Sequence, residues 1–172
     1  MNPKLSLLFG RRSIRAFKPG EVTDALVRDL LEAGMAAPSA VARDPWRFVV
    51  IKKQEILERV ASGLPNGGML AQAAVGIVVV GELDQAHGRA LSYLLQDCSA
   101  CTENILLAAH ALGLGACWLG VHPREARVEH LRSVLGIPAS IVPMAVVAIG
   151  WPAEVPEPRT RYDEAKIHYE QW

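Results

Sequence analysis

The segment from about residue 89 to residue 112 carries the clearest periodicity in the chain. Apolar residues recur along it at alternating intervals of four and three, which places their side chains on one face of a helix. A second apolar row flanks the first, so little polar surface remains in the second half. The spacing predicts a helix that is buried in the core or between subunits, with Gly113 just beyond its end. The two rows are Leu94, Cys98, Cys101, Ile105, Ala108 and Leu112, and Leu91, Leu95, Thr102, Leu106 and Ala109.

Shorter helical and extended patterns surround this segment. Thr23 followed by Asp24 marks a helix start, and Pro38 forbids that helix from continuing. Because helices and strands mix throughout, the patterns predict a layered α/β or α+β fold. We expect further helices over residues 54–62 and from about 124 to 135, and strands over residues 46–51, 74–80, 116–121 and 143–150.

Length and composition predict one globular domain over residues 1–172. The chain has 172 residues, of which 51% are hydrophobic, enough to bury a core without disulfides. Prolines and charges cluster at residues 151–161, which is typical of a linker, and we interpret residues 152–172 as a C-terminal tail. The 18 basic residues balance 18 acidic ones. No excess positive field is left for nucleic acid or anionic lipid, so we expect neither partner.

The three cysteines and the absence of a secretory leader predict a reduced, cytoplasmic protein. Residues 11–17 superficially resemble a twin-arginine export signal, but polar residues follow where an apolar stretch is required. Residues 104–123 and 133–153 lack charged side chains over lengths that could span a membrane. Glycines interrupt the first window and prolines the second, so we expect no membrane span.

Basic residues form two candidate anion-binding clusters. Arg11, Arg12 and Arg15 flank Ser13, and guanidinium groups bind phosphate in a bidentate manner. A solvated basic turn is the alternative for this segment alone. A second pair, Arg159 and Arg161, lies in the C-terminal tail. If the tail folds back, both clusters can share one phosphate.

Other candidate motifs favour structural roles. Cys98 and Cys101 form a C-x-x-C, but both lie on the apolar helical stripe and no second ligand pair accompanies them, so we expect core packing. Cys117 has no identifiable base, and the five histidines lack metal-ligand spacing. A G-x-G at residues 113–115 fails the dinucleotide fingerprint because position 118 is Trp118. No Walker lysine is present.

Four separated motifs, in order, resemble the flavin-dependent nitroreductase family. They are RRSIRAF, APSA…PWRFVVI, DCSACTENILLAAHALGLGACWLGV and PRTRYDEAKIHYEQW, and the short length resembles the family's compact branch. The resemblance implies an α+β fold with three layers (α/β/α) and a mostly antiparallel central sheet. It also implies an intertwined homodimer with two FMN sites at the subunit interface, to which the C-terminal tail contributes.

The resemblance also implies roles for individual residues. Arg11, Ser13 and Arg15 would contact the FMN phosphate, ribityl chain and ring edge, while the arginines of the tail would hold the phosphate. Leu119 and Gly120 would lie along the isoalloxazine ring, with a backbone amide near N5, and the loop from Pro38 would come from the partner subunit. No side chain is expected to be catalytic and none to bind a metal. The candidate cofactor-binding residues are Arg11, Arg12, Ser13, Arg15, Pro38, Ser39, Ala40, Ala42, Trp118, Leu119, Gly120, Arg159 and Arg161.

Two segments depart from the family's pattern. The family usually has P-S-x-x-N-x-Q-P-W, where this chain has Ala42 in place of the asparagine and Asp44 in place of the glutamine. Losing one hydrogen bond to the flavin costs about 1 kcal/mol if another group substitutes. Residues 65–69 also lack a lysine that often reaches the flavin in this family. We expect an altered FMN affinity or redox potential.

The resemblance implies an FMN-dependent oxidoreductase. NADH or NADPH would give a hydride to FMN N5, and a small acceptor would then take its place in a ping-pong order. The acceptor could be a nitroaromatic, a quinone or an activated alkene, since one fold hosts different reactions. Alternatives are a specialised flavoenzyme for dehalogenation or flavin breakdown, a non-catalytic FMN-binding module, and an α/β protein without flavin. The sequence does not choose between NADH and NADPH.

Overall fold

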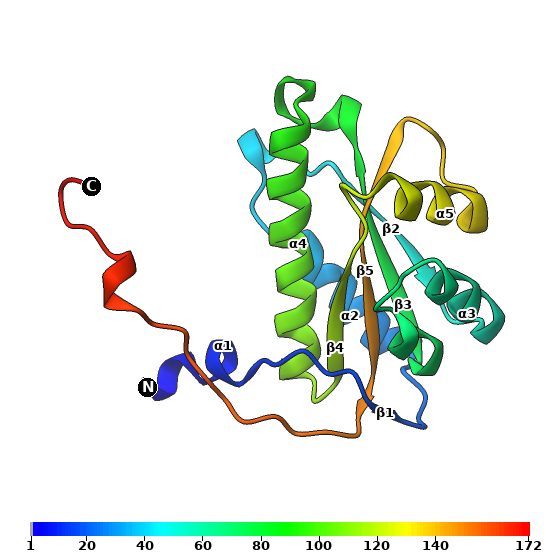
Figure 1. The fold of residues 1–172 in the computed structure, drawn as a ribbon, viewed down its shortest axis with the longest axis horizontal. Coiled ribbons are helices and arrows are strands. Elements are labelled where there is room, and N and C mark those ends of the chain that lie inside the picture. The colour runs from blue at the N-terminus through cyan, green and yellow to red at the C-terminus, as the bar shows by residue number, and fades with distance from the viewer. Residues whose placement is uncertain (1) are drawn as a thin grey trace.

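A five-stranded antiparallel sheet forms the centre of the molecule in a computed structural model, which describes residues 2–172 (Figure 1). The paired strands run in the order β1-β5-β3-β2, and β4 pairs with β5. The strands are β1 (Phe17–Lys18), β2 (Trp46–Ile51), β3 (Val75–Glu82), β4 (Gly115–Gly120) and β5 (Ile141–Pro152). The helices are α1 (Ser6–Gly10), α2 (Asp24–Met35), α3 (Gln54–Ser62), α4 (Leu91–Ala111) and α5 (Glu125–Leu135).

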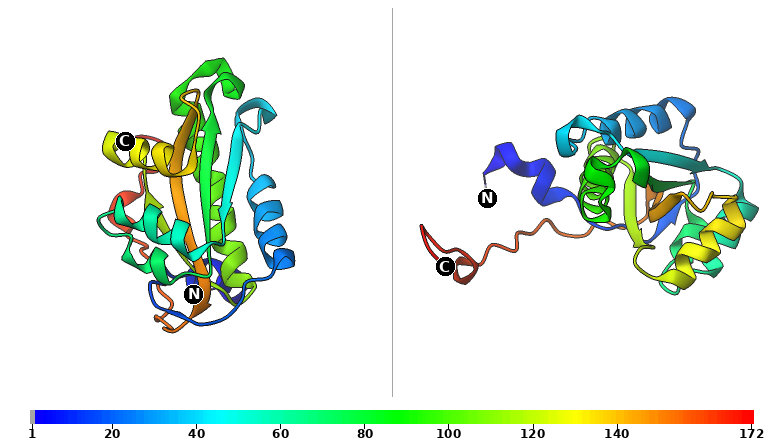
Figure 2. Two further views of the ribbon diagram at one scale, coloured as in Figure 1. Left: turned by 90° about the vertical axis from the view of Figure 1, so that its right-hand side faces the viewer. Right: turned by 90° about the horizontal axis from the view of Figure 1, so that it is seen from above.

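Helices cover both faces of the sheet (Figure 2). One apolar cluster joins α2 and α4 to the sheet, and a second joins α3 and α5 to the opposite face. The continuous apolar sequence of β3 follows from this, because a strand between two helical layers is buried on both sides. The expected three-layer α+β fold is confirmed.

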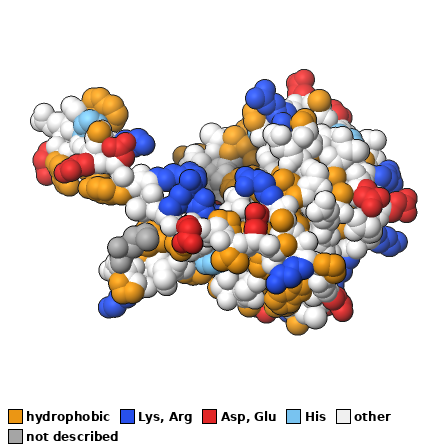
Figure 3. Space-filling view, turned by 60° about the horizontal axis from the view of Figure 1, so that its bottom comes forward, with side chains coloured by type: hydrophobic (Ala, Val, Ile, Leu, Met, Phe, Trp, Pro, Cys, Tyr) orange, Lys and Arg blue, Asp and Glu red, His pale blue; other side chains and the backbone are white. Residues whose placement is uncertain are grey.

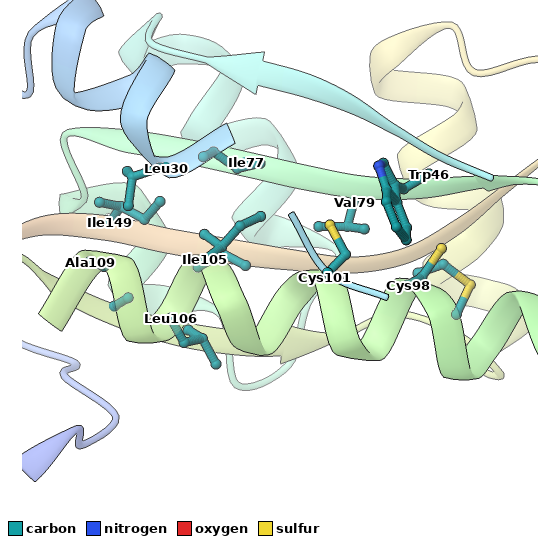
Figure 4. Packing of buried hydrophobic residues seen from close by; sticks show 14 of the residues in the cluster. Leu30, Trp46, Ile77, Val79, Cys98, Cys101, Ile105, Leu106, Ala109 and Ile149 are labelled. Atoms are coloured by element: carbon teal, nitrogen blue, oxygen red, sulfur yellow. The ribbon is translucent and has the colours of Figure 1, made fainter. Parts of the chain in front are cut away.

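The long helix α4 is the most deeply packed element. Leu94, Cys98, Cys101 and Ile105 are each at most 1% exposed. All four belong to the apolar cluster that joins α4 to α2 and the sheet, and Cys98, Cys101 and Ile105 point into it (Figure 4). The approach of α2 is close enough to require Gly34, because a Cβ there would lie 2.9 Å from Cγ1 of Ile105. The helical stripe in the sequence therefore marks the core, as predicted.

Most predicted elements are confirmed, with small differences in their ends. The Thr23 side chain accepts from the backbone amide of Leu26, as a helix cap does, and α2 ends three residues before Pro38. Gly113 adopts a positive φ of 74° just beyond α4, which satisfies the helix end. Strand β5 is longer than the expected 143–150. Consecutive residues Val79 and Val80 of β3 pair with Ala145 and Pro143, so Met144 forms a bulge in β5 and the strand continues through a proline that lacks an amide hydrogen.

Both termini extend away from the helical layers (Figure 1). Helix α1 carries exposed Leu7 and Leu8, and the tail carries exposed Tyr162, Tyr169 and Trp172. Short 3₁₀ turns lie at Pro3–Leu5, Ala40–Ala42, Gly68–Gln72, Leu83–Gln85, His87–Arg89 and Glu164–Lys166. Within residues 2–172, none of the helices combines the length and apolar character that crossing a bilayer requires.

Candidate functional site

Residues 11–16 run along the free edge of β4. The backbone amide of Ile14 donates to the carbonyl of Ala116 at 3.0 Å, and Ser13 forms a parallel bridge with the same residue. Gly115 permits this approach, because a Cβ there would lie 2.9 Å from Cβ of Ile14. The arginine-rich segment is therefore fixed by backbone pairing rather than exposed as a mobile turn, which argues against a solvated basic turn.

The C-terminal tail folds back onto this segment. Ala153 N donates to the Ala16 carbonyl at 2.9 Å, and Arg159 N donates to the Phe9 carbonyl at 3.3 Å. Between these bonds, the Glu154 carboxylate accepts from the backbone amides of residues 15 and 16. The two basic clusters, more than 140 residues apart in the sequence, are thus brought together by the fold.

Arg12 lies at the centre of the combined basic cluster. Burial lowers its pKa, and the positive charges of Arg159, Arg161 and Arg11 lower it further. Lys and Arg side chains gather where the tail meets the body of the molecule (Figure 3). The Nε atom of Arg12 is buried, and no other group in residues 2–172 accepts its hydrogen bond. Four guanidinium groups and a buried, unused donor fit a phosphate dianion.

One carboxylate moderates this cluster. Arg11 Nε lies 3.3 Å from Oε1 of Glu103 on α4, so one of the four charges is already paired. Arg12 and Glu154 also line a cavity of about 220 Å³ between the tail and α4. The charges of the cluster that no carboxylate within residues 2–172 pairs at 4.0 Å or less are those of Arg12, Arg159 and Arg161.

A polar pocket of about 230 Å³ adjoins the same edge of the sheet. Strand β4 supplies one wall, and residues 64–67 and Met69 supply the other. A Cβ placed on Gly120 would meet nothing within 4 Å, so the backbone of β4 faces open space there. Bare backbone beside a pocket permits close approach of a flat ring. The lining residues are Arg15, Leu64, Pro65, Asn66, Gly67, Met69, Cys117, Trp118, Leu119, Gly120 and Arg127.

Two polar residues of this pocket were not among the expected site residues. Asn66 lies in residues 65–69, the segment without a lysine. Its side-chain amide offers both donors and an acceptor. Arg127 on α5 donates from Nη1 to the Gly120 carbonyl at 2.7 Å. The Pro-Asn-Gly-Gly sequence marks Asn66 as part of a turn, but no sequence pattern distinguishes Arg127 from Arg132 of the same helix.

The loop 38–45 lies apart from the basic cluster of its own chain. The Asp97 carboxylate, in the first half of α4, accepts from Ala40 N at 2.9 Å. The loop is therefore held near the end of α4 that is opposite to His110 and the tail (Figure 1). Of the expected site residues, those at 11–15, 118–120, 159 and 161 come together in one chain. Pro38, Ser39, Ala40 and Ala42 do not join them.

The backbone of this loop is strained. Val41, Ala42 and Asp44 have positive φ values of 49°, 53° and 49°, which side-chain-bearing residues rarely adopt. Ser39 Oγ donates to Asp44 Oδ1 at 2.6 Å and accepts from Asp44 N at 2.9 Å. Left-handed residues with Cβ atoms, held by internal hydrogen bonds, are typical of loops that shape a binding site.

The cysteines have structural positions. Burial raises the pKa of Cys98 and of Cys101 to about 12, and burial also raises the pKa of Cys117. All three are free thiols, and the two on α4 pack in the core, as predicted. In residues 2–172, no group of three or more His, Cys, Asp or Glu side chains is placed to hold a metal ion.

Comparisons with known proteins agree with the fold. The model of the Nitroreductase family matches residues 8–67 and 59–151. The chain is 43% identical over 162 residues to "Putative NADH dehydrogenase/NAD(P)H nitroreductase" of Methanothermobacter thermautotrophicus, which covers 94% of this chain and 84% of the relative.

Solved structures extend the comparison. A crystal structure of the same name from Bacteroides thetaiotaomicron is 40% identical, with a TM-score of 0.92 over 100% of this chain and 99% of its own. An FMN-dependent nitroreductase from Clostridium difficile is 27% identical, with a TM-score of 0.89 over 98% and 99%. Because the family model matches most of the chain and two relatives are 43% and 40% identical to it, the chain belongs to the nitroreductase family.

Proposed function

We propose that this protein is an FMN-dependent oxidoreductase that takes electrons from NADH or NADPH and passes them to a small acceptor. The observation that carries the proposal is the basic cluster around Arg12, which continues along β4 into the polar pocket. Relatives named as NAD(P)H nitroreductase and FMN-dependent nitroreductase support it. When bound, FMN supplies the hydride chemistry.

The basic cluster would hold the phosphate of the cofactor. Arg12, Arg159 and Arg161 supply charge, and Ser13 supplies a hydroxyl donor. The buried Nε of Arg12 has no protein partner in residues 2–172, so a phosphate oxygen would satisfy a donor that is otherwise costly to bury. Because the tail supplies two of these arginines, phosphate binding would also fix the tail against residues 9–16.

The polar pocket would hold the flavin ring and the reactants. Arg15 would lie at the ring edge, and Asn66 would serve as a hydrogen-bonding partner on the opposite wall. Gly120 leaves the strand backbone bare, so that a planar ring can lie against it. A single pocket of this size would serve the donor and the acceptor in turn, which is a ping-pong order.

A second copy of the chain would complete the site. The loop from Pro38 to Ala42 is too far along α4 to join the arginines of its own chain, yet it has the strained backbone of a binding loop. The tail exposes Tyr162, Tyr169 and Trp172, and such residues are common in protein interfaces. We propose an intertwined homodimer in which residues 162–172 of each chain pack on the other. The three free, buried thiols support a reduced, cytoplasmic location.

The phosphate assignment is tested with the double variant Arg159→Met and Arg161→Met. Hydrogen bonds to charged groups contribute about 1.5–3 kcal/mol each, so we expect FMN affinity to fall at least a hundredfold while the protein stays folded. The measurement is the FMN absorbance that remains after saturation and desalting. The matched control is Arg28→Met with Arg124→Met, which removes two exposed arginines away from the pocket. Equal FMN retention by both double variants would overturn the assignment.

A further inference from the structure

Arg127 projects from the first turn of α5 into the polar pocket. Its Nη1 donates to the Gly120 carbonyl at 2.7 Å, which anchors the guanidinium at the end of β4. A guanidinium carries five N–H donors in a planar fork. The bond to Gly120 fixes the plane of the fork beside the backbone along which the flavin ring would lie.

The charge of Arg127 is not neutralised by the protein. Throughout residues 2–172, no carboxylate lies within 4.0 Å of its guanidinium nitrogens, whereas Arg132 on the same helix pairs with Glu129. The lining of the pocket contains two arginines, Arg15 and Arg127, and no acidic residue. Arg127 is partly buried, so its field is screened less than that of a fully exposed side chain.

Arg15 and Arg127 lie on different elements and on different sides of the pocket. Arg15 belongs to the segment that pairs with β4, next to the phosphate cluster, and it is accounted for by the cofactor in the proposed function. Arg127 lies on the other side of Gly120, on α5, and neither a group in residues 2–172 nor a part of the proposed cofactor site uses its remaining donors.

We propose that Arg127 is a specificity residue that binds an anionic substituent, a carboxylate or a phosphate, on the small molecule that shares this pocket with the flavin. The inference rests on the proposed function and names the class of its substrate. Two sources can bring such a group: an electron acceptor that carries a carboxylate, or NADPH through its 2′-phosphate, which NADH lacks. A planar guanidinium matches either anion through two parallel hydrogen bonds.

The test uses the variant Arg127→Met and pairs of small molecules that differ by one anionic group. The acceptor pair is 4-nitrobenzoate and nitrobenzene, and the donor pair is NADPH and NADH. Loss of a charged hydrogen bond corresponds to about a tenfold to hundredfold change. We expect kcat/KM to fall by that factor for 4-nitrobenzoate but by less than about twofold for nitrobenzene. A selective fall for NADPH over NADH would instead assign the anion to the electron donor.

A binding measurement accompanies the kinetics. Calorimetric titration of the oxidised FMN-loaded dimer with 4-nitrobenzoate and nitrobenzene measures selection without turnover. Arg127→Lys keeps the charge but loses the fork, and we expect it to recover part of the preference. Arg124→Met is the control, because Arg124 precedes the same helix and does not line the pocket. Equal loss for the charged and neutral members of both pairs would overturn the inference and leave Arg127 only its bond to Gly120.

The two proposals fail in distinguishable ways. If wild-type protein retains no FMN, the proposed function fails, and titration of the flavin-free protein with 4-nitrobenzoate still decides whether Arg127 selects an anion. If wild-type protein retains FMN and turns over, but Arg127→Met leaves the ratio of the two acceptors unchanged and the ratio of the two donors unchanged, only the specificity assignment is wrong.

Discussion

At the scale of single residues, we expect an added methyl group to have different effects at two glycines of β4. Gly115 is packed against Ile14, whereas Gly120 faces the empty pocket. Gly120→Ala therefore changes stability by no more than about 0.5 kcal/mol, but its methyl group enters the space assigned to the flavin and weakens FMN binding by about 1–3 kcal/mol. Gly115→Ala, by contrast, lowers stability directly. The checks are urea denaturation without FMN and FMN titration by fluorescence; unchanged FMN affinity in Gly120→Ala would contradict the pocket assignment.

Ala42 offers a gain-of-function test. Its φ of 53° is unfavourable for alanine, and asparagine tolerates this region better. Ala42→Asn restores the residue that the family usually has there. We expect about 1 kcal/mol of added stability and several-fold tighter FMN binding from one new hydrogen bond. Arg43→Asn, which changes a residue of the same loop with a φ of −84°, is the control. Equal effects of the two substitutions on FMN binding would refute the specific role of position 42.

The sequence identifies charged residues better than it locates pocket walls. The arginines at 11–15, 159 and 161 stand out by their clustering, and the fold brings them together. Sequence patterns do not identify Asn66 and Arg127, because one is a turn residue and the other is one of two arginines on its helix. Their importance comes from long-range packing of residues 64–67 and α5 against the end of β4, which no local pattern encodes.

At the scale of elements, α4 tests the core assignment of the cysteines. Replacing Cys98 and Cys101 with alanine removes two buried sulfur atoms and leaves small cavities, at a cost of about 1–3 kcal/mol in total. Neither residue touches the pocket, so FMN retention and turnover stay near wild type. Urea denaturation and steady-state rates provide the two readouts. Lost turnover with normal stability would show that the thiols act in the chemistry.

The raised pKa values of these thiols predict that the stability of the fold depends on pH. Burial raises the pKa of each from its ordinary value of 9.0 to about 12. The unfolded chain therefore ionises these thiols above about pH 9, while the folded chain keeps them protonated. Their contribution is complete below pH 9 and is lost as the pH rises toward 12. Between about pH 8 and pH 10.5, stability should fall more steeply in wild type than in the double alanine variant; parallel curves would argue against buried thiols.

Elements with long, regular patterns are predictable from this sequence, and short or irregular ones are not. Helix α4 and strand β2 lie where the periodicity places them. Helix α1 and strand β1 have only 5 and 2 residues, too few for a period to appear. The start of β5 depends on the bulge at Met144, and a bulge is a property of strand pairing rather than of local sequence. The positive φ values of loop 38–45 arise in the same way, from tertiary contacts such as that with Asp97.

At the scale of the whole molecule, we expect a homodimer whose association depends on the tail. Removing residues 162–172 deletes exposed Tyr162, Tyr169 and Trp172 but keeps both phosphate-binding arginines. We expect the truncated chain to dissociate at concentrations where the full chain stays dimeric, measured by sedimentation velocity over a concentration series. Tyr93→Ser removes one exposed aromatic residue from the body, at 41% exposure, and serves as a control. A monomeric full-length chain at every concentration would contradict the shared site.

The visible absorption spectrum during anaerobic reduction is the most direct test of whether this protein binds FMN and reduces it with a nicotinamide dinucleotide. The protein is saturated with FMN, desalted, freed of oxygen and then titrated with NADH and, separately, with NADPH. We predict flavin bands that survive desalting and bleach on addition of at least one reduced dinucleotide, because the proposed site would bind FMN and admit a hydride donor. Flavin bands that are lost on desalting, or that persist with both donors present, would contradict it.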